Sequence, residues 1–488
     1  MEDGSEPTAA ETPPSVPSMR KPPPYRAPGD SVDETALAPP AIQRRYEELL
    51  EAIALRGLAV VRDGLQGRMG SEGACFRNEH GHKPFNVDPV PRLLGAEEWS
   101  ALERGLAQRA SALDAFIRDS YTEQRIIADG AVPERVVSGS DLYDARLRGV
   151  AVPRDAYVFV YGPDIVRDEH SELFVLEDNL RTPSGVSYLL AIRDALGAQL
   201  GSELDGVRAL DPELGALAAA LQLAAPEGAD EPSVAVLTDG SHSPAFYEHC
   251  EAARRLQVPL VTLDELELDG RHVVRRDDDG RRHPVDVVYR RTDEAALSAP
   301  DGGLTPVGEK LGPAVEAGTL GVANAFGAGV GDDKLTHAYA ETLIRFYLGE
   351  EPLIRSVRTL DLGDEDQRRE ALERADELVF KVRQRAGGLG VVVEPSDEDG
   401  PGLDRIREAV AERPENYVAQ ERVSLSTHPT VGEGAFEPRR VDLRPFLFRT
   451  ATGWDAIPGG LTRFAPTQDS LVVNSTQGGG GKDTWVLD

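Results

Sequence analysis

The stretch from Leu176 to Gly185, LEDNLRTPSG, constrains the fold of this chain more than any other. It follows an alternating run, residues 172–177, that is typical of a β-strand. Because side chains alternate along a strand, we expect Glu177 and Asn179 to project to the same side. Together with Asp164, which closes an earlier apolar run, they would present the hard oxygen ligands that Mg²⁺ prefers. The alternative is an ordinary polar turn, since Asp, Asn, Pro and Gly are common turn formers.

Length and composition indicate a globular protein of two or three domains. The chain has 488 residues, of which 40% are hydrophobic and 28% are charged. No apolar run approaches the length of a membrane span, and the acidic, Pro-rich N-terminus lacks the apolar core of a signal peptide. Cys75 and Cys250 provide neither a disulfide framework nor a metal-binding pair. We therefore expect a cytoplasmic location and no membrane partner.

Charge argues against one class of partner and draws attention to the lysines. A formal net charge of −31 would repel nucleic acid. Only six of the 53 basic residues are lysine: Lys21, Lys83, Lys310, Lys334, Lys381 and Lys482. In a chain that uses arginine so consistently, each retained lysine is a candidate for a task that arginine cannot perform.

Four segments can be distinguished along the chain. Residues 1–40 are rich in Pro and acidic residues and are predicted to be a disordered tail. Residues 41–200 combine helices with the strand segment that carries the oxygen ligands. Residues 201–323 alternate strands and helices, which predicts a small open α/β domain. Residues 324–488 contain the remaining motifs, and no internal repeat is visible.

Lys381 ends a predicted strand, residues 378–381, and is followed by a glycine-rich connection to a second strand. Backbone N–H groups around Gly387, Gly388 and Gly390 can close over phosphates as a flap. A lysine at the root of such a flap supplies a compact positive charge. A plain hairpin with a flexible tip is the alternative.

Lys334 begins a predicted helix, residues 334–348, directly after Asp332 and Asp333. Either aspartate can cap the helix, which would explain the local sequence by stability alone. A lysine in the first helical turn, however, opposes the helix dipole. That position favours a second phosphate-facing lysine.

The run from Tyr417 to Glu421 is typical of a strand that ends in a polar pair, Gln420 and Glu421. Such a connector can border adenine through its backbone and place an acidic side chain on the ribose. An edge strand that runs into a loop explains the same pattern.

Several charged residues lie in or after apolar strands near the C-terminus: Asp442, Arg444, Arg449 and Arg463. An arginine inside a cleft suits a carboxylate or a transferring phosphoryl group, and a surface ion pair is the alternative. Residues 471–474 are predicted to be the last strand, and residues 474–483 a mobile polar loop, either a lid or a flexible tail. His428 is predicted to be a turn histidine, because no Cys or His lies at metal-ligand spacing.

Several blocks of the sequence resemble the circularly permuted ATP-grasp type 2 family, which is related to glutathionylspermidine synthetase-like ligases. The resemblance covers roughly residues 50–488. The blocks are Asp88–Arg92, Glu123–Gly130, Val175–Tyr188, Gly329–Lys334, Ile344–Pro352, Glu437–Phe446 and Pro458–Leu487. The order of the motifs, with the metal-ligand segment before the lysines, is the order that the permutation implies.

The resemblance implies an α/β (α+β) fold, a circularly permuted ATP-grasp with a small open, pre-ATP-grasp-like α/β domain inserted at residues 201–323. It implies ATP and Mg²⁺ as cofactors. In that case the metal is held by Asp164, Glu177 and Asn179, the ATP phosphates are contacted by Lys334 and Lys381 under the flap of Gly387, Gly388 and Gly390, and adenine is bordered by Gln420 and Glu421. The sequence departs from the family pattern at Val382, where proline is usual, and at Arg385 in the flap.

The expected activity is ATP-dependent formation of an amide from a carboxylate and an amine through an acyl phosphate. Arg181 is the first candidate for orienting the acyl phosphate, and Arg444 is the second. The substrates are expected to be small or peptide-like acids and amines, with no nucleic acid and no membrane involved. An ATP-grasp kinase and a non-catalytic nucleotide-binding scaffold remain alternatives.

Overall fold

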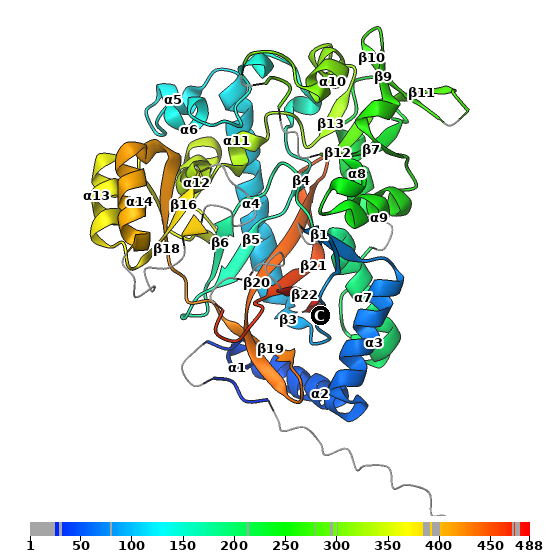
Figure 1. Cartoon of the computed structure of the whole chain (residues 1–488), viewed down its shortest axis with the longest axis vertical. Coiled ribbons are helices and arrows are strands. Elements are labelled where there is room, and N and C mark those ends of the chain that lie inside the picture. The colour runs from blue at the N-terminus through cyan, green and yellow to red at the C-terminus, as the bar shows by residue number, and fades with distance from the viewer. Residues whose placement is uncertain are drawn as a thin grey trace, which may run out of the picture.

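The computed structural model describes residues 25–28, 32–78, 81–211, 214–277, 279–292, 296–299, 301–383, 391–392, 401–470, 473 and 479–488. These residues form a mixed α/β structure with a large central sheet, a lobe built on a smaller antiparallel sheet, and a region built on a parallel sheet (Figure 1). Within them, no helix combines the length and the apolar character that crossing a membrane requires.

The central sheet joins strands from both halves of the chain. Its eight strands are β4 (Val160–Tyr161), β5 (Asp164–Arg167), β6 (Leu173–Glu177), β14 (Arg355–Ser356), β19 (Thr427–Val431), β20 (Phe436–Arg449), β21 (Trp454–Phe464) and β22 (Gly480–Lys482). The path runs β14-β6-β5-β20-β21-β22, and β4 and β19 also pair with β20. The sheet therefore brings β5 and β6, which carry Asp164 and Glu177, next to β20 and β21, which carry the predicted arginines.

Two long helices cover the central sheet. Helix α4 (Ala96–Tyr121) runs behind it in Figure 1, and its buried face includes Trp99, Leu106 and Leu113. The spacing of these residues places them on one face of the helix. Helix α12 (Lys334–Leu348) packs against α4 and has the bounds that the sequence predicts.

The antiparallel lobe consists of β15 (Thr359–Asp361), β18 (Tyr417–Glu421), β16 (Leu378–Val382) and β17 (Val391–Val392), in that order. Helices α13 (Glu365–Glu373) and α14 (Pro401–Glu412) lie beside this sheet at the left of Figure 1. Phe380 faces the small core of the lobe. Because side chains alternate along β16, its neighbour Lys381 faces the opposite side, toward the central sheet.

The parallel sheet lies within residues 201–323. Its order is β13 (Gly321–Ala323), β12 (Val287–Arg291), β7 (Val234–Thr238) and β8 (Leu260–Val261). The surrounding helices are α8 (Gly215–Leu223), α9 (Phe246–Leu256) and α10 (Pro306–Glu316), and a three-stranded antiparallel sheet projects beyond them: β9 (Leu266–Asp269), β10 (His272–Arg276) and β11 (Arg282–Val285). Strands and helices alternate here as the sequence predicts, whereas the boundaries of this domain stay a prediction.

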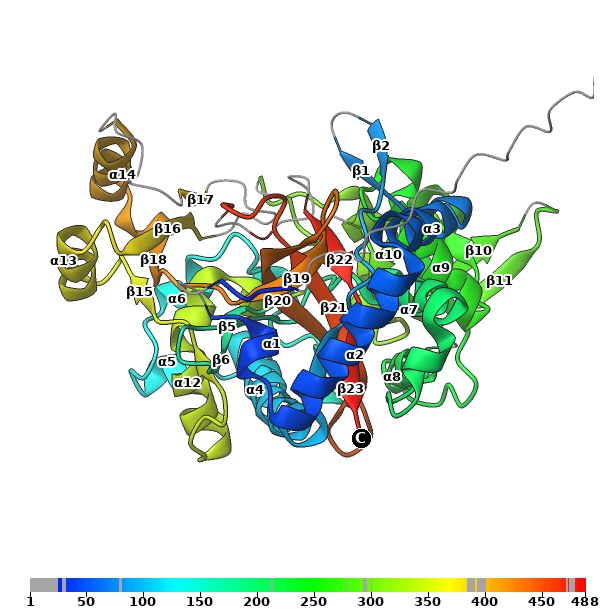
Figure 2. The same cartoon turned by 90° about the horizontal axis from the view of Figure 1, so that it is seen from below.

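Elements near the N-terminus pack along one side of the central sheet, as the view from below shows (Figure 2). They are α1 (Glu34–Leu37), α2 (Pro40–Arg56), α3 (Leu58–Ser71), the hairpin β1 (Cys75–Asn78) and β2 (Gly81–Pro84), and β3 (Arg92–Gly95); α7 (Val186–Leu200) lies against α3. Glu34 is buried, and its carboxylate accepts from Arg92 at 2.7 Å and from Arg167 at 3.1 Å. The predicted disordered tail therefore extends too far, because residues 32–40 are part of the packed structure.

The C-terminal segment also differs from its prediction. The predicted last strand, residues 471–474, lies outside the described residues except for Val473. The predicted loop continues through residues 474–478, which also lie outside them, but its end, residues 480–482, is the buried strand β22. The chain ends in β23 (Thr484–Leu487), which pairs in parallel with β3.

His428 does not lie in the turn that the sequence predicts. It is fully buried in β19, where Nε2 lies 3.2 Å from the hydroxyl of Tyr46. The prediction of a turn is therefore wrong, because this strand is covered by the N-terminal helices.

Candidate functional site

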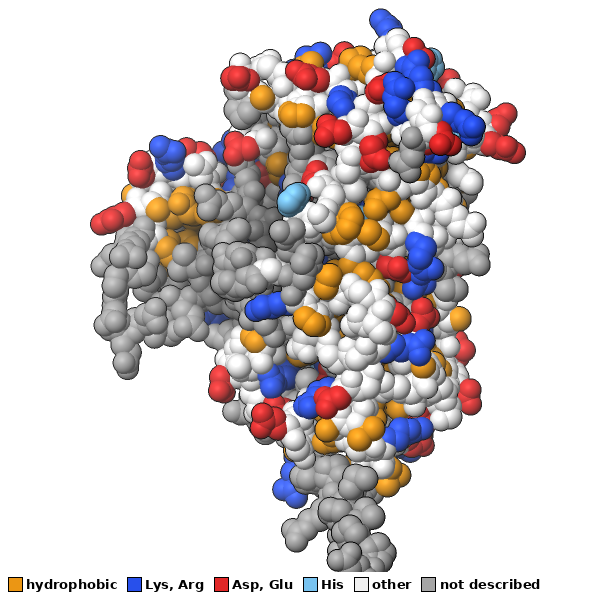
Figure 3. Space-filling view, turned by 45° about the vertical axis from the view of Figure 1, so that its right-hand side comes forward, with side chains coloured by type: hydrophobic (Ala, Val, Ile, Leu, Met, Phe, Trp, Pro, Cys, Tyr) orange, Lys and Arg blue, Asp and Glu red, His pale blue; other side chains and the backbone are white. Residues whose placement is uncertain are grey.

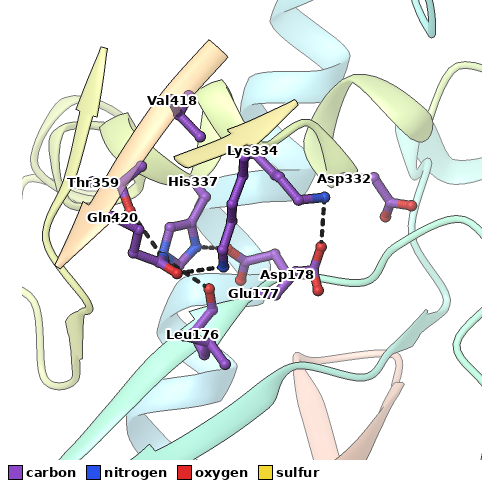
Figure 4. Close-up of a pocket in the computed structure, with 10 residues that line it drawn as sticks. Leu176, Glu177, Asp178, Asp332, Lys334, His337, Thr359, Val418 and Gln420 are labelled. Atoms are coloured by element: carbon purple, nitrogen blue, oxygen red, sulfur yellow. Dashed lines mark hydrogen bonds and ion pairs between the residues drawn. The ribbon is translucent and has the colours of Figure 1, made fainter. Parts of the chain in front are cut away.

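A pocket lies where the end of β6, the N-terminus of α12 and the antiparallel lobe meet (Figure 4). Its empty volume is about 260 Å³. The residues that line it come from distant segments of the chain: Leu176, Glu177, Asp178, Asp332, Lys334, His337, Thr359, Lys381, Val418 and Gln420. The fold thus brings Glu177, both predicted lysines and Gln420 to one site.

The start of α12 directs Lys334 toward Glu177 at the end of β6. Asp333 caps this helix by accepting from the N–H of Leu335, and Arg383 donates from Nε to both oxygens of Asp333 at 2.8 Å. The side chain of Lys334 places Nζ 2.9 Å from Oε1 of Glu177. Burial would raise the pKa of Glu177, but Lys334 and Lys381 together leave this pKa below its ordinary value.

Lys381 reaches the pocket from β16 and donates from Nζ to Oε1 of Gln420 at 2.5 Å. The amide nitrogen of Gln420 donates to the carbonyl of Leu176 at 3.1 Å and to Oγ1 of Thr359 at 3.0 Å, which fixes its orientation. Burial lowers the pKa of Lys381 to about 8, although the nearby carboxylate of Glu177 acts in the opposite direction. This ammonium is thus paired with a neutral amide, and an anionic ligand would stabilise it.

Asp164 belongs to a compact ion cluster on the central sheet. Arg444 donates to its two oxygens at 2.8 and 3.0 Å, and Arg463 donates to it at 2.6 Å. Arg463 also binds Asp442 at 2.5 and 2.9 Å. Burial would raise the pKa of Asp164, but the two arginines hold it below its ordinary value.

The three predicted metal ligands lie together. Asp164 and Glu177 are directly opposite each other in the β5–β6 pairing, so their side chains share a face. The amide nitrogen of Asn179 donates to the carbonyl of Gly162 at 2.9 Å and to Asp164 at 3.3 Å, which leaves the amide oxygen for a cation. Two carboxylates and an amide oxygen are a donor set that fits Mg²⁺.

Arg181 lies beside the pocket and is held there by Asp332. Its Nε donates to Oδ2 of Asp332 at 2.5 Å, and its backbone N–H donates to Oδ1 at 3.0 Å. Asp332 lines the pocket, and it precedes the cap residue of α12. Arg181 and Arg444 are therefore fixed by different carboxylates. Asp332 holds the first, and Asp164 holds the second.

Residues 91–465 match the family model described as circularly permuted ATP-grasp type 2. The chain belongs to this family. The resemblance read from the sequence motifs is confirmed.

Curated relatives extend over most of the chain. An uncharacterized protein of Mycobacterium tuberculosis (strain ATCC 25618 / H37Rv) is 39% identical over 448 residues, which cover 91% of this chain and 80% of the relative. A Frankia casuarinae protein named "Putative glutamate--cysteine ligase 2-2" is 40% identical over 470 residues, which cover 93% of this chain but only 53% of that protein. The chain thus spans about half the length of the Frankia relative.

A solved structure shares the fold of this ATP-grasp chain. It is a glutathione synthetase-like effector from Globodera pallida in its apo form, with a TM-score of 0.60 and 11% sequence identity. The similarity covers 94% of this chain and all of the effector. At this identity the match supports the overall architecture.

Glu421 lies on the face of β18 opposite to Gln420. Its carboxylate lies 3.3 Å from Arg358 and 3.3 Å from Arg374 and is partly exposed. The lining of the pocket includes Gln420 but not its neighbour. The assignment of Glu421 to the nucleotide stays a prediction, and the flap glycines Gly387, Gly388 and Gly390 lie outside the described residues.

A buried cluster that was not predicted from the sequence forms one wall of the pocket. Asp178, fully buried, accepts from Arg109 at 2.7 Å through both of its oxygens and from the hydroxyl of Tyr161 at 2.6 Å. His337 lies 2.8 Å from the same carboxylate. One signal was available, since His337 follows Lys334 by three residues and residues at this spacing share a helix face.

Proposed function

We propose that this ATP-grasp protein is an ATP- and Mg²⁺-dependent ligase that joins a carboxylate to an amine. The observation that carries the proposal is the pocket in which Glu177, Lys334 and Lys381 meet. A strand-end carboxylate opposite two lysines is the arrangement that a magnesium–triphosphate needs, because it supplies both a metal ligand and charges for the phosphates.

The nucleotide would lie between the lobe and the central sheet. Lys334 and Lys381 would neutralise its phosphates, and the N–H groups at the start of α12 add a favourable dipole. The lowered pKa of Lys381 supports this placement, because an anion restores the stability of the charged form. Gln420 holds Lys381 in position, and Thr359 holds Gln420.

Glu177 and Asn179 would hold Mg²⁺, with Asp164 beside them. A bound Mg²⁺ would neutralise charge on the phosphates and orient them for transfer. Of the three residues, Glu177 and Asn179 are the more available, since Asp164 already carries two arginines. We expect Asp164 to act chiefly by holding Arg444 and Arg463 beside the metal ligands.

The reaction proceeds in two balanced steps. A carboxylate oxygen of the acid substrate forms a bond to the γ-phosphorus while the bond from that phosphorus to the β,γ-bridging oxygen breaks, which gives an acyl phosphate and ADP. The amine nitrogen then attacks the acyl carbon, the carbon–oxygen bond to phosphate breaks, and the amine proton leaves with the products. Arg181 and Arg444 are the candidates for binding the substrate carboxylate and the acyl phosphate.

The names of relatives agree with this class of reaction but do not assign the substrate. Glutamate–cysteine ligation forms an amide from a carboxylate and an amine, which is the proposed reaction type. Because this chain covers only 53% of the Frankia protein, that activity can belong to the unmatched half. The acid and amine are therefore to be found by experiment.

The decisive experiment is trapping with hydroxylamine. The full chain is incubated with Mg·ATP, a panel of amino acids, peptides and other small acids, and hydroxylamine, and the products are analysed by mass spectrometry. A ligase releases ADP and yields a hydroxamate of its acid substrate. Lys381→Met should abolish this product, whereas Lys310→Met, which changes a lysine outside the pocket, should leave it unchanged.

Other outcomes separate the alternatives. Release of AMP in place of ADP would contradict an acyl phosphate route. A stable phosphorylated product that forms without any amine would identify a kinase. Binding of Mg·ATP without turnover across acids and amines would identify a nucleotide-dependent scaffold.

A further inference from the structure

His337 presents a fixed hydrogen-bonding atom to the pocket that the proposed function does not use. It lies on α12 three residues after Lys334 and lines the same pocket, and its side chain is 4% exposed. Its Nδ1 lies 2.8 Å from Oδ2 of Asp178. The opposite ring nitrogen, Nε2, is buried and has no hydrogen-bond partner among the described residues. Figure 4 shows the ring beside Gln420, with Nδ1 linked to Asp178.

The environment of the ring decides which nitrogen carries the proton. Asp178 is held as a carboxylate by an ion pair, because Arg109 donates to both of its oxygens at 2.7 Å. An ionised carboxylate can only accept, so Nδ1 must donate to it. Arg109 also lies 3.1 Å from Nδ1, but its shorter bonds, at 2.7 Å, go to Asp178.

With the proton on Nδ1, the neutral ring has its lone pair on Nε2. Burial lowers the pKa of His337 and outweighs the opposite effect of Asp178, so the ring is neutral in the free protein. A buried acceptor that makes no hydrogen bond lowers stability, and a ligand that supplies a donor removes this cost.

The chemistry of the pocket limits what this ligand group can be. Lys334 and Lys381 are donors that match the acceptor oxygens of phosphates, whereas Nε2 of His337 needs a donor. In a nucleotide, the available donors are the 6-amino group of adenine and the ribose hydroxyls. A base with a carbonyl at position 6 would place an acceptor against an acceptor.

We propose that Nε2 of His337 accepts a hydrogen bond from the bound nucleotide and thereby selects ATP over nucleotides that lack the donor. This inference rests on the proposed function, since it requires a nucleotide in the pocket. It assigns His337 a direct contact and a role in specificity, while Asp178 acts as a positioning residue that fixes the ring.

Two substitutions at this position form a matched pair. His337→Asn keeps an amide nitrogen near the position of Nδ1, which can still donate to Asp178, but it removes the atom at Nε2. His337→Gln loses the contact with Asp178 and can place its amide oxygen near the position of Nε2 as a substitute acceptor. Thermal unfolding of both variants checks that each is folded.

The test measures dissociation constants by calorimetry for wild type and both variants. The probes are the Mg²⁺ complexes of ATP, inosine triphosphate, which has a carbonyl in place of the 6-amino group, 2′-deoxyATP and 3′-deoxyATP. We expect wild type to prefer ATP to inosine triphosphate by about tenfold, the size of one hydrogen bond. His337→Asn should lose this preference without weakening inosine triphosphate, and His337→Gln should retain part of it.

The two deoxynucleotides test the other possible donors, the ribose hydroxyls. If wild type prefers ATP to one of the deoxynucleotides and His337→Asn loses that preference instead, the donor is the missing hydroxyl. Equal affinity of wild type for all four nucleotides would overturn the inference without any variant, as would unchanged selectivity in His337→Asn. If wild type binds none of them, the nucleotide site itself fails, and the proposed function fails with it.

Discussion

Two lysines of this lysine-poor chain, Lys482 and Lys381, have different surroundings: the first is buried and the second is partly exposed. Lys482, in β22, is fully buried and donates to a carboxylate oxygen of Asp88 and to the carbonyl of Pro429 at 2.8 Å; it also lies 5.3 Å from the ring centre of Phe464. Lys381 donates to the neutral amide of Gln420 and lines a pocket. Burial lowers the pKa of both ammonium groups.

The comparison shows how function can be separated from structure in residues of one type. Lys482 has an anionic partner in the protein, so its charge is satisfied when the chain folds. Lys381 donates to a dipole and lies near both a carboxylate, Glu177, and a second cation, Lys334, so an anion that enters the pocket would stabilise its charge further. The first arrangement stabilises the fold, and under the proposed function the second would leave a charge available to a ligand.

The charged side chains at the surface do not fall into these two groups. Acidic and basic side chains are interspersed over the face that Figure 3 shows. Several of the ion pairs among the surface residues join side chains that are each about half exposed, such as Arg355–Glu172. Pairs of this kind contribute little to the free energy of folding, so larger effects are expected from the buried groups.

The largest effect is expected at Lys482. Lys482→Met leaves the buried carboxylate of Asp88 without its cation, and the free energy of unfolding should fall by about 3–5 kcal/mol. Denaturant titration of the full chain measures this change. In the double variant Lys482→Met/Asp88→Asn, much of the loss should return; an equal or larger loss would mean that the ion pair is not its cause.

The corresponding substitution at Lys381 should weaken nucleotide binding without destabilising the fold. Lys381→Met should weaken Mg·ATP binding by about 10–100-fold, or about 1.4–2.8 kcal/mol, because the phosphates lose a charged donor. The free energy of unfolding should not fall, and at neutral pH it should rise, because the folded protein no longer holds an ammonium whose pKa is lowered by burial. Calorimetry and denaturant titration measure the two effects, with Lys310→Met as the control; a large loss of stability would give Lys381 the structural role of Lys482.

The pH dependence should distinguish folding from binding at Lys381. Its pKa is about 8 in the folded protein and 10.5 ordinarily, so the unfolded chain binds more protons between these values. The contribution of this group to stability therefore rises from pH 8 to 10.5. Binding has the opposite trend, because ATP needs the charged form: affinity should fall above pH 8 by up to about tenfold per pH unit.

This trend can be checked by titrating Mg·ATP into wild type and Lys381→Met from about pH 7 to about pH 10. The variant should lack the step near pH 8. A step of equal size in both proteins would assign it to another group.

The smallest effect is expected at Glu421. Its carboxylate is shared between Arg358 and Arg374 at the surface, so Glu421→Gln should change the free energy of unfolding by no more than about 1 kcal/mol. We expect less than about a threefold change in ATP affinity. A loss of about tenfold would instead support the contact with the ribose that the sequence predicts.

Much of the site could be predicted because its residues stand at the ends of regular elements. Glu177 ends an alternating strand, Lys334 starts an amphipathic helix, and Lys381 lies near the end of a strand. Such positions are visible in the local pattern of the chain. The family motifs then supplied the order in which these elements meet.

Other features could not be predicted because they depend on contacts between distant segments. The sequence around Gly480–Lys482 is typical of a loop, yet it pairs with β21 and is buried there by the rings of Phe464 and Phe85. The sequence around Glu34 is typical of a tail, yet Arg92 and Arg167 hold its carboxylate in the core. In both cases tertiary partners outweigh local propensity.

The sequence by itself determined the family, the identity of the candidate ligands and the elements that carry them, because periodicity and motif spacing are local properties. Only the tertiary structure decided which charges are satisfied within the protein. It paired Lys482 with Asp88 and Asp164 with two arginines, gave Lys381 an uncharged partner, and turned His337 toward the same pocket. The physical reason is that the energy of a buried charge depends on its neighbours in space, and these come from distant parts of the chain.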